Sequence, residues 1–243
     1  YMSGNAVLTA AKEVRDALLQ RAALQLEVQP EELDMADSKV FVKADPSQAI
    51  ELAQLAAVCA SEGIPRAKLA MFRAPFREKP DFNNLQADIF PDYTFGAHAV
   101  EVAVDMETGE VTVLKSIGAH DVGRAINPAA VAGQIEGSAS MGQGYALMED
   151  VIYQDGRLKT PSLAEYLLPT AEDTGLVKAI ILESGTGLGP FGAKGIGEPS
   201  LSPVAPAIAN AIADAIQARI CDLPITPEKI VRAIAARTAE TIQ

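Results

Sequence analysis

Residues 185–199 read Gly-Thr-Gly-Leu-Gly-Pro-Phe-Gly-Ala-Lys-Gly-Ile-Gly-Glu-Pro. Six of the first thirteen are glycine, which lets the backbone adopt positive φ and come close to another group, at a high cost in chain entropy. The stretch also holds one basic residue, Lys194, and one carboxylate, Glu198. We therefore expect a loop that wraps a bound organic cofactor and presents Glu198 to a substrate. The alternative is a loop that only packs against the helix following it.

The common nucleotide-binding motifs do not fit these glycines. From Gly187 the spacing to Lys194 is one residue out of register for a P-loop, and Gly195 stands where Ser or Thr is required. Gly142-Gln-Gly144 lacks the third glycine and the preceding strand of a dinucleotide-binding fingerprint.

A second glycine-rich stretch, residues 133–144, lies inside a helical pattern together with small residues. A glycine costs roughly 1 kcal/mol in a helix, so we expect another group to approach this backbone closely. Close contact between two helices is the alternative. A third stretch, residues 119–128, places polar groups and a helix cap at the end of a strand, where they would line a pocket.

The first part of the chain predicts helices at residues 4–26 and 50–60, because apolar residues recur at helical spacing. Asp45 and Pro46 are typical of the cap and first position of the second helix. A short hairpin and a strand are predicted as well, over residues 33–42 and 69–76.

Residues 79–92 are polar with prolines at both ends, which predicts a boundary between a first unit, residues 1–90, and a second, residues 91–243. Two β-rich runs joined by turn residues then predict a hairpin over residues 93–104 and 111–122.

Asn127 and Pro128 predict the cap and first residue of a helix that reaches about Leu147. Strands and helices mix without strict alternation, which favours an α+β fold. The helix over 201–220 has apolar residues around nearly its whole circumference, so it should be deeply buried. The remaining pattern predicts a small hairpin, a strand and a last helix, over residues 151–158, 176–183 and from Thr226 onward.

The composition limits the partners. A net charge of −12 argues against nucleic acid, which is bound by clustered Lys and Arg. No run approaches the ~18 apolar residues of a spanning helix, and no signal peptide is visible, so a cytoplasmic location is the default. Cys59 and Cys221 are expected to be two buried thiols rather than a disulfide or metal ligands. The start at Tyr1, already inside a helical pattern, suggests a fragment or a processed subunit.

Three segments together resemble one family. They are Asp121-Val-Gly-Arg-Ala-Ile-Asn-Pro128, Gly133-Gln-Ile-Glu-Gly137 and Gly189-Pro-Phe-Gly-Ala-Lys-Gly-Ile-Gly-Glu-Pro199. Their order and spacing resemble the C-terminal part of the molybdopterin-binding large subunit of the xanthine dehydrogenase and aldehyde oxidase family of molybdenum hydroxylases. Residues 93–105 are similar to the segment that opens the last subdomain of these subunits. The resemblance covers nearly the whole chain.

The resemblance implies that Glu198 is the general base beside the molybdenum, in a hydroxylation of an electron-poor carbon of an N-heterocycle or aldehyde with water as the oxygen source. A buried carboxylate suits this role, because desolvation raises its pKa. The metal itself is expected to be held by the pterin dithiolene and not by the protein. The residues implied in cofactor binding are Gln134, Gly137, Ser138, Lys194, Gly195 and Gly197.

Several polar residues have simpler interpretations. Lys194 is expected to brace its loop rather than to react, and Asp121 to accept hydrogen bonds from the backbone at its strand end. His98 and His120 are expected to be hydrogen-bonded structural histidines. Glu136 either touches the site or has a surface or capping role.

The resemblance also implies partners. Iron-sulfur and FAD groups are expected on other domains or subunits, the molybdopterin is expected with or without a cytosine dinucleotide, and the remaining part of the large subunit supplies further cofactor contacts. The isolated chain is therefore expected to be inactive. The rival hypothesis is a non-catalytic cofactor-binding or scaffold module of the same fold. Carbon monoxide oxidation is a weaker alternative, because the copper-binding cysteine loop of that subgroup would lie outside this chain.

Overall fold

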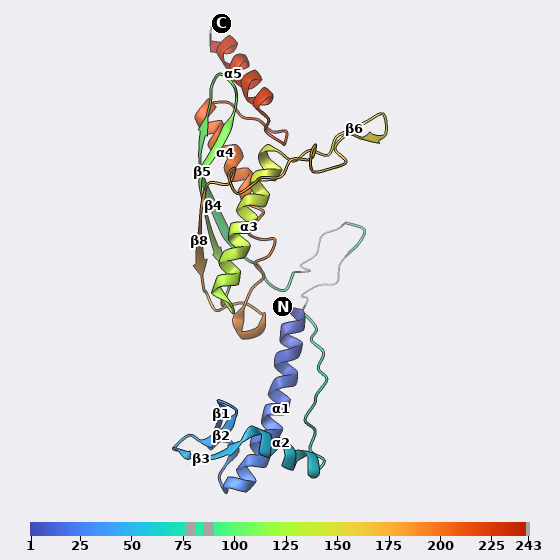
Figure 1. Ribbon diagram of the computed structural model, residues 1–243, viewed down its shortest axis with the longest axis vertical. Helices are drawn as coiled ribbons and strands as arrows, with labels where there is room; N and C mark the ends of the chain where they lie inside the picture. Colours follow the sequence, from blue (N-terminus) through green and yellow to red (C-terminus); the bar gives the residue numbers. More distant parts are fainter. Residues whose placement is uncertain (76–80, 85–89, 242–243) are drawn as a thin grey trace. The chain divides into compact units, whose positions relative to one another are not determined.

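The computed structural model describes residues 1–75, 81–84 and 90–241. Helices and strands are interspersed along the described chain, so the predicted α+β class is confirmed. The chain divides into two compact units, Tyr1–Pro91 and Asp92–Gln243, each with a hydrophobic core of its own. The helices and most of the strands of each unit are labelled in Figure 1.

The first unit combines two helices with an antiparallel sheet of order β1-β2-β3. Leu19 of the long helix, Val40 and Ile50 of the sheet and Leu55 of the shorter helix meet in its core. The predicted long helix and hairpin are confirmed. The elements are α1 (Met2–Leu26), the 3-10 turn η1 (Pro30–Glu32), β1 (Leu33–Ala36), β2 (Lys39–Val42), β3 (Asp45–Glu51) and α2 (Leu52–Ser61).

The predicted cap at Asp45 is wrong, because this residue begins strand β3. Its carboxylate accepts a hydrogen bond from the Ser47 backbone N–H at 3.2 Å, which is the local pattern that resembles a helix cap. Pairing along the sheet, with Ile50 opposite Val40, keeps the segment extended. The helix α2 therefore begins only after the strand has ended.

The predicted strand at residues 69–76 is also wrong over residues 69–75, which form neither helix nor strand. Leu69 and Met71 are largely exposed there, so their apolar pattern does not reflect a buried sheet face. Phe76 and parts of the predicted boundary segment, residues 79–92, lie outside the described residues.

The second unit is built on a sheet of order β4-β5-β8, with β4 antiparallel and β8 parallel to β5. The helices α3 and α4 pack on one face of it, as Figure 1 shows. The predicted hairpins and the strand before the glycine loop are confirmed. The elements are β4 (Gly96–Val104), β5 (Val111–Asp121), α3 (Pro128–Leu147), β6 (Tyr153–Gln154), β7 (Arg157–Leu158), β8 (Leu176–Leu182), the 3-10 turn η2 (Pro190–Gly192), α4 (Val204–Ile216) and α5 (Pro227–Thr241).

Helix α3 begins where the sequence predicts it. The Asn127 side chain accepts a hydrogen bond from the Ala130 backbone N–H at 3.1 Å, and Pro128 occupies the first turn, where a missing N–H costs nothing. Because only six residues separate the start of this helix from the end of β5, it packs against the sheet that β5 belongs to.

Helix α4 is shorter than predicted and buries one face rather than its whole circumference. Ile208, Ile212 and Ile216 are buried at helical spacing, whereas Asn210 and Asp214 are exposed. The alanines between these two faces are only partly covered, and this explains the misleading pattern.

The cysteines are only partly as expected. Cys59 is buried in the first core, but Cys221 is exposed, so the prediction of two buried thiols is wrong for Cys221. Over residues 1–75, 81–84 and 90–241, no helix combines the length and the apolar character that crossing a membrane requires.

Candidate functional site

The glycine-rich loop begins where strand β8 ends. Because β5 and β8 are parallel, with Asp121 opposite Leu182, their carboxyl ends lie at the same edge of the sheet. The loop is tied to the end of β5 by two backbone bonds, from Gly185 N–H to the Gly123 carbonyl and from Lys194 N–H to the Val122 carbonyl, both 2.8 Å. Residues 185–199 and residues 119–128, two of the stretches singled out in the sequence, therefore lie next to each other.

Asp121 is the polar centre of this edge. Its carboxylate accepts hydrogen bonds from Lys194 Nζ at 2.7 Å, the Gly123 N–H at 2.9 Å, the Ser184 hydroxyl at 2.9 Å and the Ser184 N–H at 3.2 Å. Burial alone would raise the pKa of this carboxyl, but the hydrogen bonds outweigh it and hold the pKa well below its usual range. Asp121 thus remains ionised while it joins three segments.

Lys194 serves this arrangement from inside the loop. Its side chain is only 6% exposed, and its ammonium lies 5.5 Å from the centre of the Phe95 ring, on the segment before β4. The prediction that Lys194 braces its loop agrees with these contacts.

The far end of the loop is held by helix α3. The Ser138 and Ser200 hydroxyls are 2.5 Å apart and both side chains are buried. The one proton of the Ser200 hydroxyl is shared between the carbonyls of Ile196 and Gly197, at 3.0 Å each. Ser138, predicted as a cofactor contact, therefore lies behind the surface and supports the loop.

Gln134 lies on the exposed side of α3, next to the loop. A Cβ built on Gly197 would be 3.7 Å from Gln134 Oε1, so this amide is adjacent to the residue before Glu198. No residue of the described segments hydrogen-bonds the Gln134 side chain. Its donor and acceptor are free to bind a ligand.

A pocket of about 190 Å³ lies between the end of β5, the start of α3 and the loop. Its polar lining consists of Arg124, Asn127, Gln134 and Lys194, and the rest is apolar. This agrees with the expectation that residues 119–128 line a pocket. The full lining is Val122, Arg124, Ile126, Asn127, Ala130, Val131, Gln134, Ala193, Lys194 and Ile196.

Glu198 lies on the loop between the Lys194 and Ser200 anchors and is exposed. Its carboxylate makes no hydrogen bond or ion pair with the described residues. The desolvation expected of this carboxylate is therefore not supplied by the described residues of the second unit, none of which covers this side of the loop.

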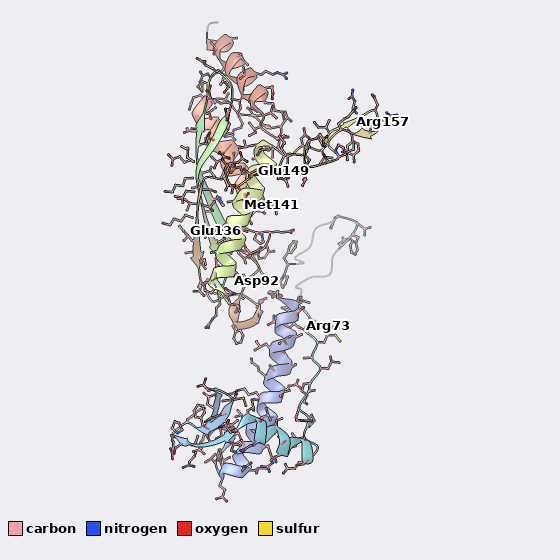
Figure 2. The ribbon with its side chains drawn as sticks, viewed as in Figure 1. Arg73, Asp92, Glu136, Met141, Glu149 and Arg157 are labelled. Atoms are coloured by element: carbon pink, nitrogen blue, oxygen red, sulfur yellow. The ribbon has the colours of Figure 1, made fainter. Side chains whose placement is uncertain are left out.

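The glycines of α3 serve two purposes. At Gly142 an added Cβ would collide with the side chain of Val204 on α4, which is the helix-to-helix contact expected as the alternative. At Gly133 and Gly137, as at Gly195 in the loop, an added Cβ would meet no atom within 4 Å. These three positions expose backbone with open space beside it, into which a ligand can come close. Figure 2 labels Glu136 and Met141 of the same helix, and both are exposed.

The two histidine rings lie 6.3 Å apart, with His120 fully buried and His98 half-buried. His98 bonds the Ser116 hydroxyl at 2.7 Å, as expected, but neither ring nitrogen of the fully buried His120 has a partner among the described residues. Burial lowers the pKa of both rings, and the neighbouring His120 adds to the effect at His98. The described segments contain no group of three or more His, Cys, Asp or Glu that could hold a metal ion.

Several anchoring residues went unnoticed in the sequence. Ser184 and Ser200 hold the two ends of the loop, Thr94 donates to the Gly195 carbonyl at 2.8 Å, and Asp92 accepts from the Leu188 N–H at 2.9 Å. The signal for Ser184 was a polar residue directly after an apolar strand. Thr94 and Asp92 carry no local signal, since they lie about a hundred residues from their partners.

Comparison with known proteins identifies the family. A family model described as the molybdopterin cofactor-binding domain matches residues 1–175. The chain is 33% identical to the 6-hydroxypseudooxynicotine dehydrogenase complex subunit gamma of Paenarthrobacter nicotinovorans over 94% of this chain and 28% of that protein. It is 35% identical to the xanthine dehydrogenase molybdenum-binding subunit of Escherichia coli over 56% of this chain and 18% of that protein.

Among solved structures, quinoline 2-oxidoreductase from Pseudomonas putida 86 superposes with a TM-score of 0.76 and 30% identity, over 93% of this chain and 28% of that one. The chain therefore belongs to the molybdopterin cofactor-binding domain family, in the xanthine dehydrogenase and aldehyde oxidase group. It spans little more than a quarter of the length of the two relatives that match nearly all of it.

Proposed function

We propose that this chain forms one wall of the active site of a molybdenum hydroxylase, with Glu198 as general base and Gln134 as a contact to the cofactor. The observation that carries the proposal is the juxtaposition of the free Gln134 amide with the Gly197-Glu198 segment on an open surface. Because the chain belongs to a molybdopterin-binding family, molybdopterin is the ligand that we propose for that surface. The proposed substrate is an N-heterocycle or aldehyde with an electron-poor carbon, in keeping with the names of the relatives.

The residues divide into those that touch the cofactor and those that support them. Gln134, Gly137, Gly195 and Gly197 have open surface and can lie against a pterin. Ser138 and Lys194 are bonded to other protein groups, Ser138 behind that surface and Lys194 in the wall of the pocket beside it. The proposed cofactor is molybdenum held by the dithiolene of molybdopterin, with or without a cytosine dinucleotide.

When bound, the cofactor would supply the redox chemistry that adds an oxygen atom from water to the substrate. The part of Glu198 is to accept a proton at its carboxylate. Its exposure in this chain means that cofactor, substrate and further protein would complete the site around it, and their arrival would shield the carboxylate from water. Exposed apolar side chains near the site, Phe95, Ile126, Met141 and Phe191, fit a surface that becomes covered.

The proposed partners are the remaining part of a molybdopterin subunit, an iron-sulfur subunit and an FAD subunit. The relative from Paenarthrobacter nicotinovorans is named as a subunit of a complex, which supports an assembly of several chains. Only two cysteines are present, so the chain cannot supply the four thiolates that an iron-sulfur cluster usually needs.

The proposal is tested by purifying the chain in its complex, co-expressed with the neighbouring genes, and measuring molybdenum and pterin per chain. We expect both at a ratio of about one, and turnover of quinoline or benzaldehyde that incorporates oxygen from labelled water. A complex without molybdenum and pterin would overturn the proposal and favour the scaffold hypothesis. Gln134→Ala should lower the molybdenum content, whereas Glu51→Gln, at an exposed position of the first unit, should leave it unchanged.

A further inference from the structure

Two anchors flank the residue proposed as the base. The first is Asp121, which holds Lys194 at 2.7 Å. The second is Ser138, which holds Ser200 at 2.5 Å. Only five residues separate Lys194 from Ser200, and Glu198 is one of them.

The first anchor joins three segments at one carboxylate. Asp121 ends β5, Ser184 follows β8, and Lys194 belongs to the glycine loop. Both charged side chains of the Asp121–Lys194 pair are largely shielded, at 15% and 6% exposed, so water competes little with their ion pair. The Lys194 ammonium is therefore committed to the loop, and its charge is balanced by Asp121.

The second anchor fixes the backbone just before the carboxylate. The Ser200 hydroxyl bonds the Ile196 and Gly197 carbonyls, which closes a tight turn around Glu198, and Ser138 holds that hydroxyl from α3. Ile196 packs into the small core formed by Val122 and Ile135, so this stretch is pinned by apolar contact as well.

Without such anchors the stretch would be mobile. Gly195 and Gly197 give the backbone freedom on both sides of Ile196, and the Glu198 side chain itself has no partner among the described residues. A general base must lie within hydrogen-bond reach of the proton that it accepts, and a misplacement of about 1 Å can cost roughly 10²-fold in rate.

We propose that Asp121 and Ser138 are positioning residues, which act through Lys194 and Ser200 to fix the Gly195–Pro199 backbone and thereby the Glu198 carboxylate. This inference rests on the proposed function of Glu198. Ser138 and Lys194, first expected to contact the cofactor, are then residues that support the base. Asp121 becomes a residue on which turnover depends.

The test compares variants in the assembled enzyme. Asp121→Asn keeps the shape of the side chain but removes its charge, and Ser138→Ala removes the hydroxyl. Each should lower kcat by about 10- to 100-fold with KM within about threefold and molybdenum content unchanged. The control Glu51→Gln breaks the exposed Lys39–Glu51 ion pair of the first unit and should change none of these. A kcat within twofold of the original, or a loss of molybdenum that accounts for the lost activity, would overturn the proposal.

Hydrogen exchange of the chain itself gives a readout that does not need turnover. In Asp121→Asn the amides of residues 185–199 should be accelerated about tenfold more than those of β4, β5 and α4, whose acceleration reports the loss of global stability alone. Equal acceleration throughout the second unit would show a merely structural role and contradict the proposal, as would no acceleration. If Glu198→Gln leaves turnover intact, the proposed function has failed; if only the Asp121 and Ser138 variants are harmless, the positioning role alone has failed.

Discussion

Asp121 makes the stability of the second unit depend on pH. The hydrogen bonds to its carboxylate depress the folded pKa below the value of about 3.9 expected in the unfolded chain, despite the opposing effect of burial. The unfolded state therefore takes up the proton first as pH falls. The stability from this residue is fully present above about pH 4 and is lost progressively below it.

Urea unfolding of the chain and of Asp121→Asn between pH 7 and pH 3 measures this dependence. We expect Asp121→Asn to lower the free energy of unfolding by about 3 kcal/mol at neutral pH, because a shielded partner is left uncompensated. The difference should shrink as pH falls below about 4. A difference that stays constant over the range would contradict the assignment.

His120 makes a second, separate pH dependence. The buried ring has a depressed pKa in the folded state, so the unfolded chain, with a pKa near 6.5, protonates first on acidification. The second unit should lose stability as pH falls below about 6.5, by at most about 1.4 kcal/mol per unit of depression. His120→Leu should flatten this slope between pH 7.5 and pH 5 in thermal unfolding, and an unchanged slope would exclude His120 as its source.

Helix α3 uses its glycines differently along its length. Gly137→Ala adds a methyl group to an open surface and should stabilise the isolated chain by about 0.5–1 kcal/mol through helix propensity. Gly142→Ala forces a methyl group against Val204, where the nearest γ carbon would be 2.5 Å away, and should cost about 1–3 kcal/mol. Thermal unfolding of the two variants checks the opposite signs.

In the assembled enzyme the same Gly137→Ala variant should lose molybdopterin, because the open surface is where we propose the cofactor lies. Pterin content measures this loss. A variant that is more stable alone and fully loaded in the complex would show that this face of α3 is not in contact with the cofactor.

The elements that sequence predicted best are those with a local cause. The cap at Asn127, the proline after it and the turn between β4 and β5 act within a few residues, and all are observed. Asp45 shows the limit, since its hydrogen bond to the next residues is the same in a cap and in the strand that forms. Whether it begins a helix depends on pairing with β2.

The residues of the site also divide into those with a local sequence signal and those that depend on distant contacts. The glycine loop and Gln134 could be found from composition and resemblance, because both lie in short motifs. The Asp121–Lys194 anchor joins residues 73 positions apart, and the Ser138–Ser200 anchor joins residues 62 apart. Neither has a local pattern, so only the parallel pairing of β5 with β8 and the packing of α3 reveal them.

At the scale of the whole molecule, the chain has separate hydrophobic cores in its two units. Leu55 and Ile212 are each fully buried, one in each core. We expect Leu55→Ala and Ile212→Ala each to remove about 2–5 kcal/mol from the unit that contains it. Hydrogen exchange measures the loss of protection in each unit separately, and we expect each variant to affect mainly its own unit. A loss of protection spread evenly over both units in either variant would contradict two separately organised cores.

The central claim is that this chain supplies the general base of a molybdenum hydroxylase. The most direct measurement is kcat of the assembled enzyme carrying Glu198→Gln, with molybdenum and pterin per chain determined on the same preparation. We predict a fall in kcat of about 10²-fold or more at unchanged cofactor content, because the amide cannot accept the proton. A fully loaded variant that turns over within about tenfold of the original enzyme would contradict the claim.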